Sequence, residues 1–124
     1  MQAVKAKDTT PEMHIRRILH ALGYRYRLHV KTLPGTPDLV FRSRRKIIFV
    51  HGCFWHGHDC RRGARIPKTN IQYWKEKISR NRQRDARVLD TLRELGWSVF
   101  TVWECQLAAT SPGTLRTFLD SAAP

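Results

Sequence analysis

The apolar positions of residues 10–22 recur at intervals of three and four, as on one face of a helix. Thr10 is the predicted N-cap of this helix, and Gly23 is its predicted stop. Residues 24–30 instead alternate apolar side chains with basic or polar ones, which is typical of a strand with one buried face. We therefore expect an amphipathic helix followed by a strand.

Two short apolar runs, residues 38–41 and 46–50, follow a Leu-Pro-Gly-Thr-Pro turn signal and are separated by a basic turn. This pattern predicts a β-hairpin. Because the strands of a hairpin are antiparallel, the start of the first strand lies beside the end of the second. We therefore expect Asp38 to lie near Val50 and His51.

Residues 70–95 carry the longest helical pattern, with Thr69 or Asn70 as the cap. The predicted inward face comprises Trp74, Ile78, Asn81, Asp85, Val88, Leu89, Leu92 and Leu95. Asn81 and Asp85 interrupt this otherwise apolar face. Either these two side chains lie just off the buried centre in solvent, or the helix passes an active site there.

Residues 97–103 are apolar on both faces, which predicts an interior strand covered by helices. A short final helix is expected over residues 115–119, after a Ser-Pro-Gly-Thr start signal. The order helix, three strands, helix, strand, helix predicts an α/β fold in which a small mixed sheet is flanked by helices. The length and the lack of any repeat or linker pattern predict a single domain over residues 1–124.

The charge balance narrows the expected partners, because 23 lysine and arginine residues against 10 aspartate and glutamate residues give a formal net charge of +13. A polyanion such as nucleic acid is the natural partner of so basic a domain. No membrane association is expected, because the uninterrupted apolar runs are only a few residues long and no signal or lipid motif stands out. Residues 1–9 are short and basic, and form either a frayed terminus or a flexible arm along DNA.

Residues 51–60 hold three of the six histidines and two of the three cysteines. An odd number of cysteines argues against a secreted disulfide scaffold and favours the cytoplasm. Thiolate and imidazole are preferred zinc ligands, and Cys53, His58, Cys60 and the distant Cys105 would form a closed tetrahedral set. Such a site would be structural and would fix this polar loop. The alternative is a set of buried thiols beside solvated histidines.

The two other histidines of this stretch, His51 and His56, are not part of the proposed zinc set and are candidates for catalysis. A neutral imidazole can accept a proton from water at physiological pH. Asp38 is the best-placed carboxylate to hold a magnesium ion beside such a base, and Glu12, near a helix start, could orient a histidine. Each histidine alone is more often structural, but its combination with Asp38 favours phosphodiester hydrolysis.

Three stretches resemble the very short patch repair (Vsr) endonucleases: residues 33–38 (LPGTPD), 49–60 (FVHGCFWHGHDC) and 95–105 (LGWSVFTVWEC), with Trp74 in the long helix between them. The resemblance covers nearly the whole chain. It implies a restriction-endonuclease-like α/β fold. It also implies a magnesium-dependent nick on the 5′ side of the thymine in a T:G mismatch, which arises when 5-methylcytosine deaminates.

By the same resemblance, Asp38 and the main-chain carbonyl of Val50 hold magnesium, and His56 is the general base. His51 lies beside the reacting phosphate, and Glu12 supports His56. The zinc ligands that the resemblance implies are the four already proposed from ligand chemistry. The family also has polar positions on its long helix, which correspond here to Asn81 and Asp85.

Phe54, Trp55 and Trp74 match the aromatic residues that the family inserts into the base stack beside the mismatch. A T:G pair is weakly held, and stacking worth about 1–3 kcal/mol per base would offset the cost of unstacking there. The alternative for these side chains is core packing. Trp97 and Trp103, on the predicted buried strand, are assigned to the core.

The chain differs from the wider nuclease superfamily in one motif, and from typical Vsr members in the length of its N-terminal segment. The wider nuclease superfamily carries an acid-x-Lys motif on the second strand, where this chain has residues 49–51 (FVH), as the narrower Vsr family predicts. The N-terminal segment is shorter than in typical members, so we expect reduced DNA affinity or a different context preference.

We therefore predict a strand-specific DNA mismatch endonuclease that acts as a monomer on nucleoid DNA in the bacterial cytoplasm, with catalytic Mg²⁺ and structural Zn²⁺. A mismatch-repair protein is a candidate partner. Two alternatives stay open: a zinc-stabilised DNA-binding mismatch sensor without catalysis, and an RNA-directed nuclease. The sensor does not explain why Asp38, His51 and His56 occur together.

Overall fold

The computed structural model describes residues 9–53, 60 and 68–121. The elements follow the predicted order of helix, three strands, helix, strand and helix. They are α1 (Thr10–Ala21), β1 (Arg27–Leu28), β2 (Leu39–Phe41), β3 (Lys46–His51), α2 (Ile71–Glu94), β4 (Ser98–Trp103) and α3 (Pro112–Asp120), with two 3-10 helices, η1 (Arg42–Arg44) and η2 (Glu104–Ala109).

The four strands form one mixed sheet in the order β1-β2-β3-β4. β2 pairs antiparallel with both β1 and β3, and β3 pairs parallel with β4. The predicted hairpin and the predicted small mixed sheet are therefore confirmed. The closer likeness to a restriction endonuclease stays an expectation from the resemblance.

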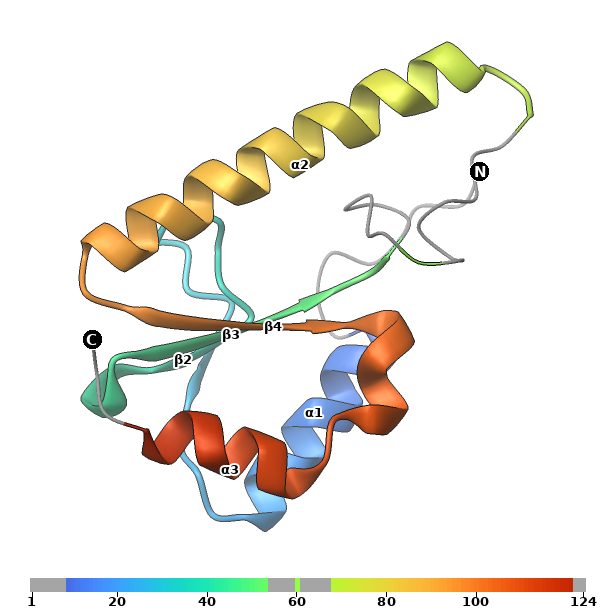
Figure 1. Ribbon diagram of the computed structural model, residues 1–124. Helices are drawn as coiled ribbons and strands as arrows, with labels where there is room; N and C mark the ends of the chain where they lie inside the picture. Colours follow the sequence, from blue (N-terminus) through green and yellow to red (C-terminus); the bar gives the residue numbers. More distant parts are fainter. Residues whose placement is uncertain (1–8, 54–59, 61–67, 122–124) are drawn as a thin grey trace.

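Helices cover both faces of the sheet, with α2 on one face and α1 and α3 on the other (Figure 1). Because successive side chains of a strand point to opposite faces, β2 and β3 supply residues to two cores. The core under α1 and α3 contains Ile15, Leu19, Leu39, Phe41, Ile48, Val102, Leu115 and Leu119. The core under α2 contains Val40, Ile47, Phe49, Leu92 and Trp97.

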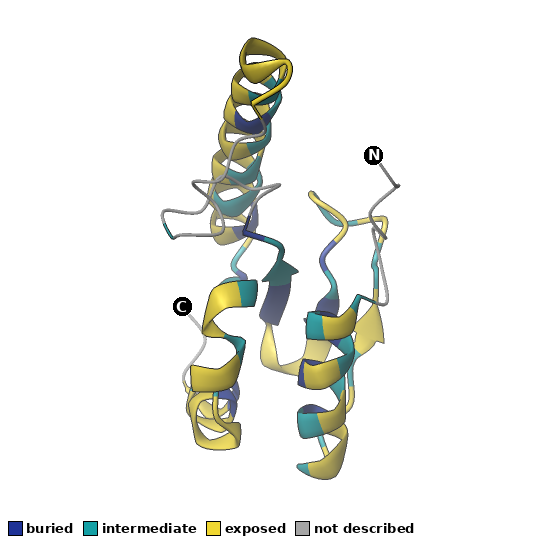
Figure 2. Ribbon diagram, turned by 90° about the vertical axis from the view of Figure 1, so that its right-hand side faces the viewer, coloured by how far each residue is buried: buried dark blue, intermediate teal, exposed yellow. Residues whose placement is uncertain are grey.

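Helix α2 runs for 24 residues and is exposed over most of its outward surface (Figure 2). Its buried residues are Ile78 and Leu92, and the predicted inward positions between them are half-buried. Leu95, also predicted to face inward, is 51% exposed because the helix has already ended at Glu94. Within the described ranges, no helix has both the length and the apolar surface needed to cross a bilayer.

The starts of α1 and α2 differ in detail from the prediction. The N-cap of α1 is Thr9 rather than Thr10, and its Oγ1 accepts a hydrogen bond from the main-chain N–H of Glu12 at 3.3 Å. Asn70 does precede α2, as predicted. Its φ of 60° is left-handed, however, and its side chain makes no capping hydrogen bond within the described part of the chain.

Two strand predictions were wrong in extent or position. β1 has two residues, both exposed, instead of spanning residues 24–30, although Tyr24 and Tyr26 are half-buried and pack their rings on Phe41. β4 is an edge strand of the described sheet instead of an interior one. Its apolar character has another cause, because helices cover both of its faces (Figure 1).

Gly35, in the turn between β1 and β2, packs against α2 and so fixes the turn that leads to Asp38. Its φ is +76°, and an added Cβ would lie 2.5 Å from Cγ1 of Val88. We expect Gly35→Ala to lower the unfolding free energy by about 2–5 kcal/mol, the sum of a left-handed penalty and an overpacking penalty. Chemical denaturation with circular dichroism would measure the loss.

Gly23 offers the matched control. Its φ is +85°, but an added Cβ there meets nothing within 4 Å. Gly23→Ala should therefore cost only about 1–2 kcal/mol, the backbone penalty alone. Equal losses for the two variants would show that the contact with Val88 is readily relieved.

Candidate functional site

Asp38 lies where the start of β2 meets the end of β3. In the antiparallel register Leu39 pairs with Ile48, so Asp38 stands beside the last residues of β3. The main-chain N–H of Val50 donates a hydrogen bond of 2.8 Å to Oδ2 of Asp38. The predicted proximity of Asp38 to the end of this strand is therefore confirmed.

Glu12 reaches the same place from the first turn of α1. It is only 1% exposed, which is rare for a carboxylate and requires charged or polar partners. Oε1 and Oε2 of Glu12 each lie 3.0 Å from Nε2 of His29, and Oε2 also accepts a 3.4 Å bond from Nη1 of Arg16. Glu12 therefore contacts a histidine, His29, and the predicted contact with His56 lies outside the described residues.

His29 was missed by the sequence analysis, which treated it as one polar position of a strand. Its main-chain N–H donates to the carbonyl of Asp38 at 3.1 Å, which continues the β1–β2 ladder by one pair. Its φ of 47° is left-handed, which costs a non-glycine residue roughly 1–2 kcal/mol. The sequence could have indicated His29 by its position, because His29 and Asp38 flank one turn and would face each other across the two paired strands.

The electrostatics of this cluster favour a cation. Side-chain ligand atoms of Glu12, His29 and Asp38 all lie within 4.8 Å of one another. Burial raises the pKa of Asp38 from 3.8 to about 6, the N–H of Val50 opposes that rise, and the nearby Glu12 adds to it. Two desolvated carboxylates at this spacing are stabilised by a bound positive charge.

His51, the last residue of β3, lies at the same end of the sheet. Its ring is half-buried between Phe49 and Trp103, whose ring centroids are each 5.2 Å from that of His51. Trp103, assigned to the core from the sequence, is only half-buried, and its ring packs against that of His51 in a T-shaped, edge-to-face arrangement. Trp97 is buried, as predicted.

The three cysteines gather beyond the ends of β3 and β4. Their sulfur atoms lie within 4.8 Å of one another, and no disulfide joins them. Cys53 is fully buried, and its Sγ accepts a 3.3 Å hydrogen bond from the main-chain N–H of Cys105. Burial raises the pKa of Cys53 to about 12, against the lowering effect of that hydrogen bond. The structure therefore brings together three of the four predicted zinc ligands.

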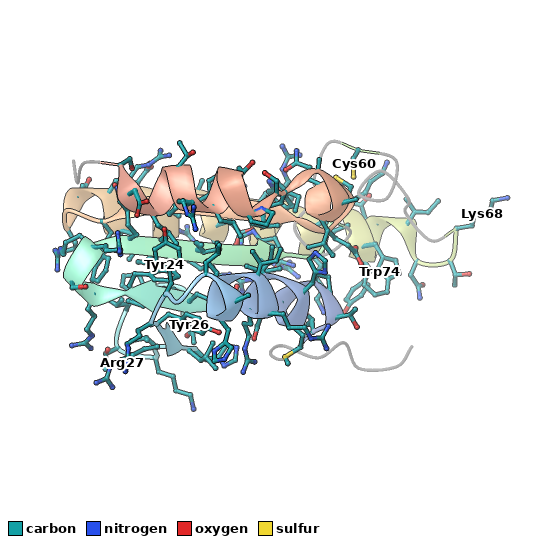
Figure 3. All side chains as sticks on the ribbon, turned by 90° about the horizontal axis from the view of Figure 1, so that it is seen from below. Tyr24, Tyr26, Arg27, Cys60, Lys68 and Trp74 are labelled. Carbon is teal, nitrogen blue, oxygen red and sulfur yellow. The ribbon has the colours of Figure 1, made fainter. Side chains whose placement is uncertain are left out.

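The remaining predicted site residues differ in how far the structure describes them. Trp74 is half-buried near the start of α2, and Figure 3 shows it at the same end of the molecule as Cys60. Asn81 and Asp85 are half-buried on the inward face of α2, so full solvation is excluded. Four predicted site residues lie outside the described residues: Phe54, Trp55, His56 and His58.

Comparisons with known proteins point to one family. A sequence model of the family described as DNA mismatch endonuclease Vsr matches residues 1–62. The chain is 52% identical over 122 residues to the type II nicking enzyme V.XorIIP of Xanthomonas oryzae pv. oryzae, covering 97% of this chain and 89% of the relative. It is 43% identical over 107 residues to the DNA mismatch endonuclease Vsr of Escherichia coli, covering 86% and 68%. It is 42% identical over 107 residues to the type II nicking enzyme V.NmeAIP of Neisseria meningitidis, covering 86% and 76%.

Proposed function

This chain belongs to the Vsr family of DNA mismatch endonucleases, and on that premise we propose that it nicks the thymine-containing strand of a T:G mismatch in a Mg²⁺-dependent reaction. Its general activity is that of a DNA endonuclease. One observation carries the proposal of Mg²⁺-dependent catalysis: Asp38 and Glu12 form a desolvated pair of carboxylates at the end of the hairpin. A mismatch sensor without catalysis would have no need of such a pair.

The residues present fit a magnesium ion. Carboxylate and carbonyl oxygens are the donors that Mg²⁺ prefers. Val50 directs its N–H toward Asp38, and in an extended strand the carbonyl of the same residue faces the same side, which supports Val50 as a second donor. When bound, the ion would neutralise charge that develops on the phosphate. His51 would contact the reacting phosphate, and His56, supported by Glu12, would take the proton from water.

A zinc site is the second part of the proposal, and the three thiols support it. Tetrahedral thiolates at about 2.3 Å from zinc lie about 3.8 Å apart, which sulfur atoms within 4.8 Å of one another can reach by small movements. His58 is the proposed fourth ligand. The site would fix the loop that carries Phe54, Trp55 and His56.

Duplex DNA containing a T:G mismatch is the proposed substrate, bound by a monomer with or without a mismatch-repair partner. Trp74 is the described candidate for insertion, and Nζ of Lys77 lies 6.0 Å from the centroid of its ring. Tyr73 is 51% exposed beside it, with ring centroids 5.1 Å apart. The outward surface of α2 adds exposed basic side chains that suit phosphate contacts: Lys75, Arg80, Arg82, Arg84, Arg87 and Arg93.

The substrate preference is tested with two duplexes that differ only at one pair, T:G or T:A. Under single-turnover conditions with Mg²⁺, we expect nicking of the T:G duplex to be faster by at least about 100-fold. The reason is that exposing a weakly paired base costs a few kcal/mol less. Denaturing gels with each strand labelled in turn would give the rate and the strand.

A duplex with the mismatch inverted provides the control, since the nick should move to the strand that now holds thymine. Equal rates on T:G and T:A duplexes would end the mismatch proposal. Stronger competition by structured RNA than by mismatched DNA would favour the RNA-directed alternative instead.

A further inference from the structure

His29 has no role in the function proposed above, yet its side chain lies beside two carboxylates, the buried Glu12 and the half-buried Asp38. Its Nε2 lies 3.0 Å from each oxygen of Glu12, and it belongs to the same cluster of potential ligand atoms as Asp38. It is half-buried, and the ladder hydrogen bond from its main-chain N–H to Asp38 sets its position. The imidazole is therefore held at the candidate metal site.

The spacing within the cluster matches that of ligands around one ion. Adjacent ligands of an octahedral ion at about 2.1 Å lie about 3.0 Å apart, and opposite ligands lie about 4.2 Å apart. His29 Nε2 and the Glu12 oxygens already show the first spacing, and the ligand atoms of all three residues lie within 4.8 Å of one another. A single cation can therefore bind all three with only small side-chain movements.

A nitrogen donor changes which ion such a site prefers. Mg²⁺ selects oxygen ligands, whereas first-row transition metals accept imidazole readily. We propose that His29 is a ligand of the catalytic metal site beside Glu12 and Asp38, and that it makes this site bind Mn²⁺ more tightly than Mg²⁺. The inference rests on the proposed function in one respect, that Asp38 holds the metal.

A simpler role for His29 would be to hold Glu12 in place by a hydrogen bond. His29→Gln separates the two roles. The amide nitrogen of glutamine reaches nearly the same position as Nε2 and can donate to a carboxylate, but it is not a metal ligand. A role limited to hydrogen bonding survives this substitution, whereas ligation by nitrogen is lost, even if the amide oxygen of glutamine replaces it at the metal.

The test uses the zinc-loaded protein without DNA and follows Mn²⁺ binding by electron paramagnetic resonance. Zinc keeps the thiol cluster filled, and thiolates are poor ligands for Mn²⁺. In the wild type we expect ¹⁴N modulation of the bound Mn²⁺ signal in electron spin-echo experiments, from a directly coordinated imidazole. His29→Gln should remove that modulation and weaken Mn²⁺ binding by about tenfold or more, while Mg²⁺ binding changes by less than about threefold.

His20→Gln is the matched control, because His20 is exposed near the end of α1, and its Mn²⁺ spectrum should equal that of the wild type. Persistence of the ¹⁴N modulation in His29→Gln, or its absence from the wild type, would overturn the assignment. Asp38→Asn distinguishes a failure of the His29 assignment from a failure of the proposed function. If Asp38→Asn keeps both Mn²⁺ binding and nicking, the catalytic metal site itself is wrong, and the His29 proposal fails with it.

Discussion

Asp38→Asn should reduce the rate of nicking by at least about a thousandfold while leaving DNA binding intact. Asparagine keeps the shape of the side chain and can still accept the hydrogen bond from Val50, so only the charge is lost. A metal contributes several kcal/mol of charge stabilisation in the transition state, and about 4 kcal/mol corresponds to a thousandfold in rate. Single-turnover nicking and a binding assay on the same mismatched duplex would measure the two effects.

The same substitution should stabilise the metal-free protein at neutral pH. Burial raises the pKa of Asp38 to about 6 from 3.8, so the folded state disfavours the charged form. The protonated carboxyl therefore contributes stability below pH 4, and this contribution is lost as the pH rises through 6. Relative to the wild type, Asp38→Asn should gain on the order of 3 kcal/mol between these pH values.

Asp90→Asn serves as the control, because Asp90 is exposed on α2. It should change neither the nicking rate nor the pH dependence of unfolding. Nicking by Asp38→Asn at the wild-type rate would remove Asp38 from the metal site. A variant less stable than the wild type at pH 8 would show that interactions of the carboxylate outweigh its desolvation.

Cys53→Ser should abolish stoichiometric zinc binding and lower the unfolding free energy by at least about 3 kcal/mol, because the free energy of binding zinc to a folded site contributes directly to folding. Serine retains the size of the side chain but is not a zinc ligand, and Cys53 is the fully buried member of the cluster. Native mass spectrometry would give the zinc content, and chemical denaturation would give the stability. Nicking should fall as well, because the loop that carries His56 would lose its anchor.

A chelator provides the internal control for this experiment. Removing zinc from the wild type should lower its stability to that of Cys53→Ser, and the same chelator should leave the variant unchanged. One equivalent of zinc retained by Cys53→Ser would refute the assignment of this ligand. If the wild type contains no zinc and Cys53→Ser is still less stable by the same amount, Cys53 contributes to stability only through packing.

The sequence predicted the order of the elements because each element has a local pattern. The long helix from residue 71 keeps its apolar positions three and four apart, and the hairpin consists of two apolar runs around a basic turn. Antiparallel pairing then required Asp38 to meet the end of β3, and the hydrogen bond to Val50 confirms this. Local patterns and the antiparallel pairing of the hairpin were therefore sufficient to predict the order of the elements and the position of Asp38.

The position of each strand in the sheet could not be predicted in the same way. Residues 97–103 are apolar on both faces, and this pattern cannot distinguish a central strand from an edge strand that helices cover on both faces. The alternation of residues 24–30 likewise predicted a longer β1. The regular strand β1 ends at Leu28 because the next residue, His29, has a left-handed φ of 47°, and no apolar pattern records that angle.

The cluster of Glu12, His29 and Asp38 shows a second limit of the sequence. Glu12 and Asp38 were identified, but their partner was not, because His29 is a single polar residue outside any motif. Its importance follows from tertiary contacts that α1 and the β1–β2 turn create together. The thiol cluster was easier to predict, since the chain contains only three cysteines and their chemistry limits their use.

The parallel pairing of β3 with β4 also has a consequence for the rates of folding and unfolding. Cys53 and Cys105 are 52 residues apart, and closing a loop of that length costs about 3.5 kcal/mol of chain entropy. Formation of the β3–β4 pair already closes this loop, so the thiols meet with little further entropic cost. Zinc would then bind after the slowest pairing step. We expect it to lengthen the lifetime of the native state far more than it speeds folding.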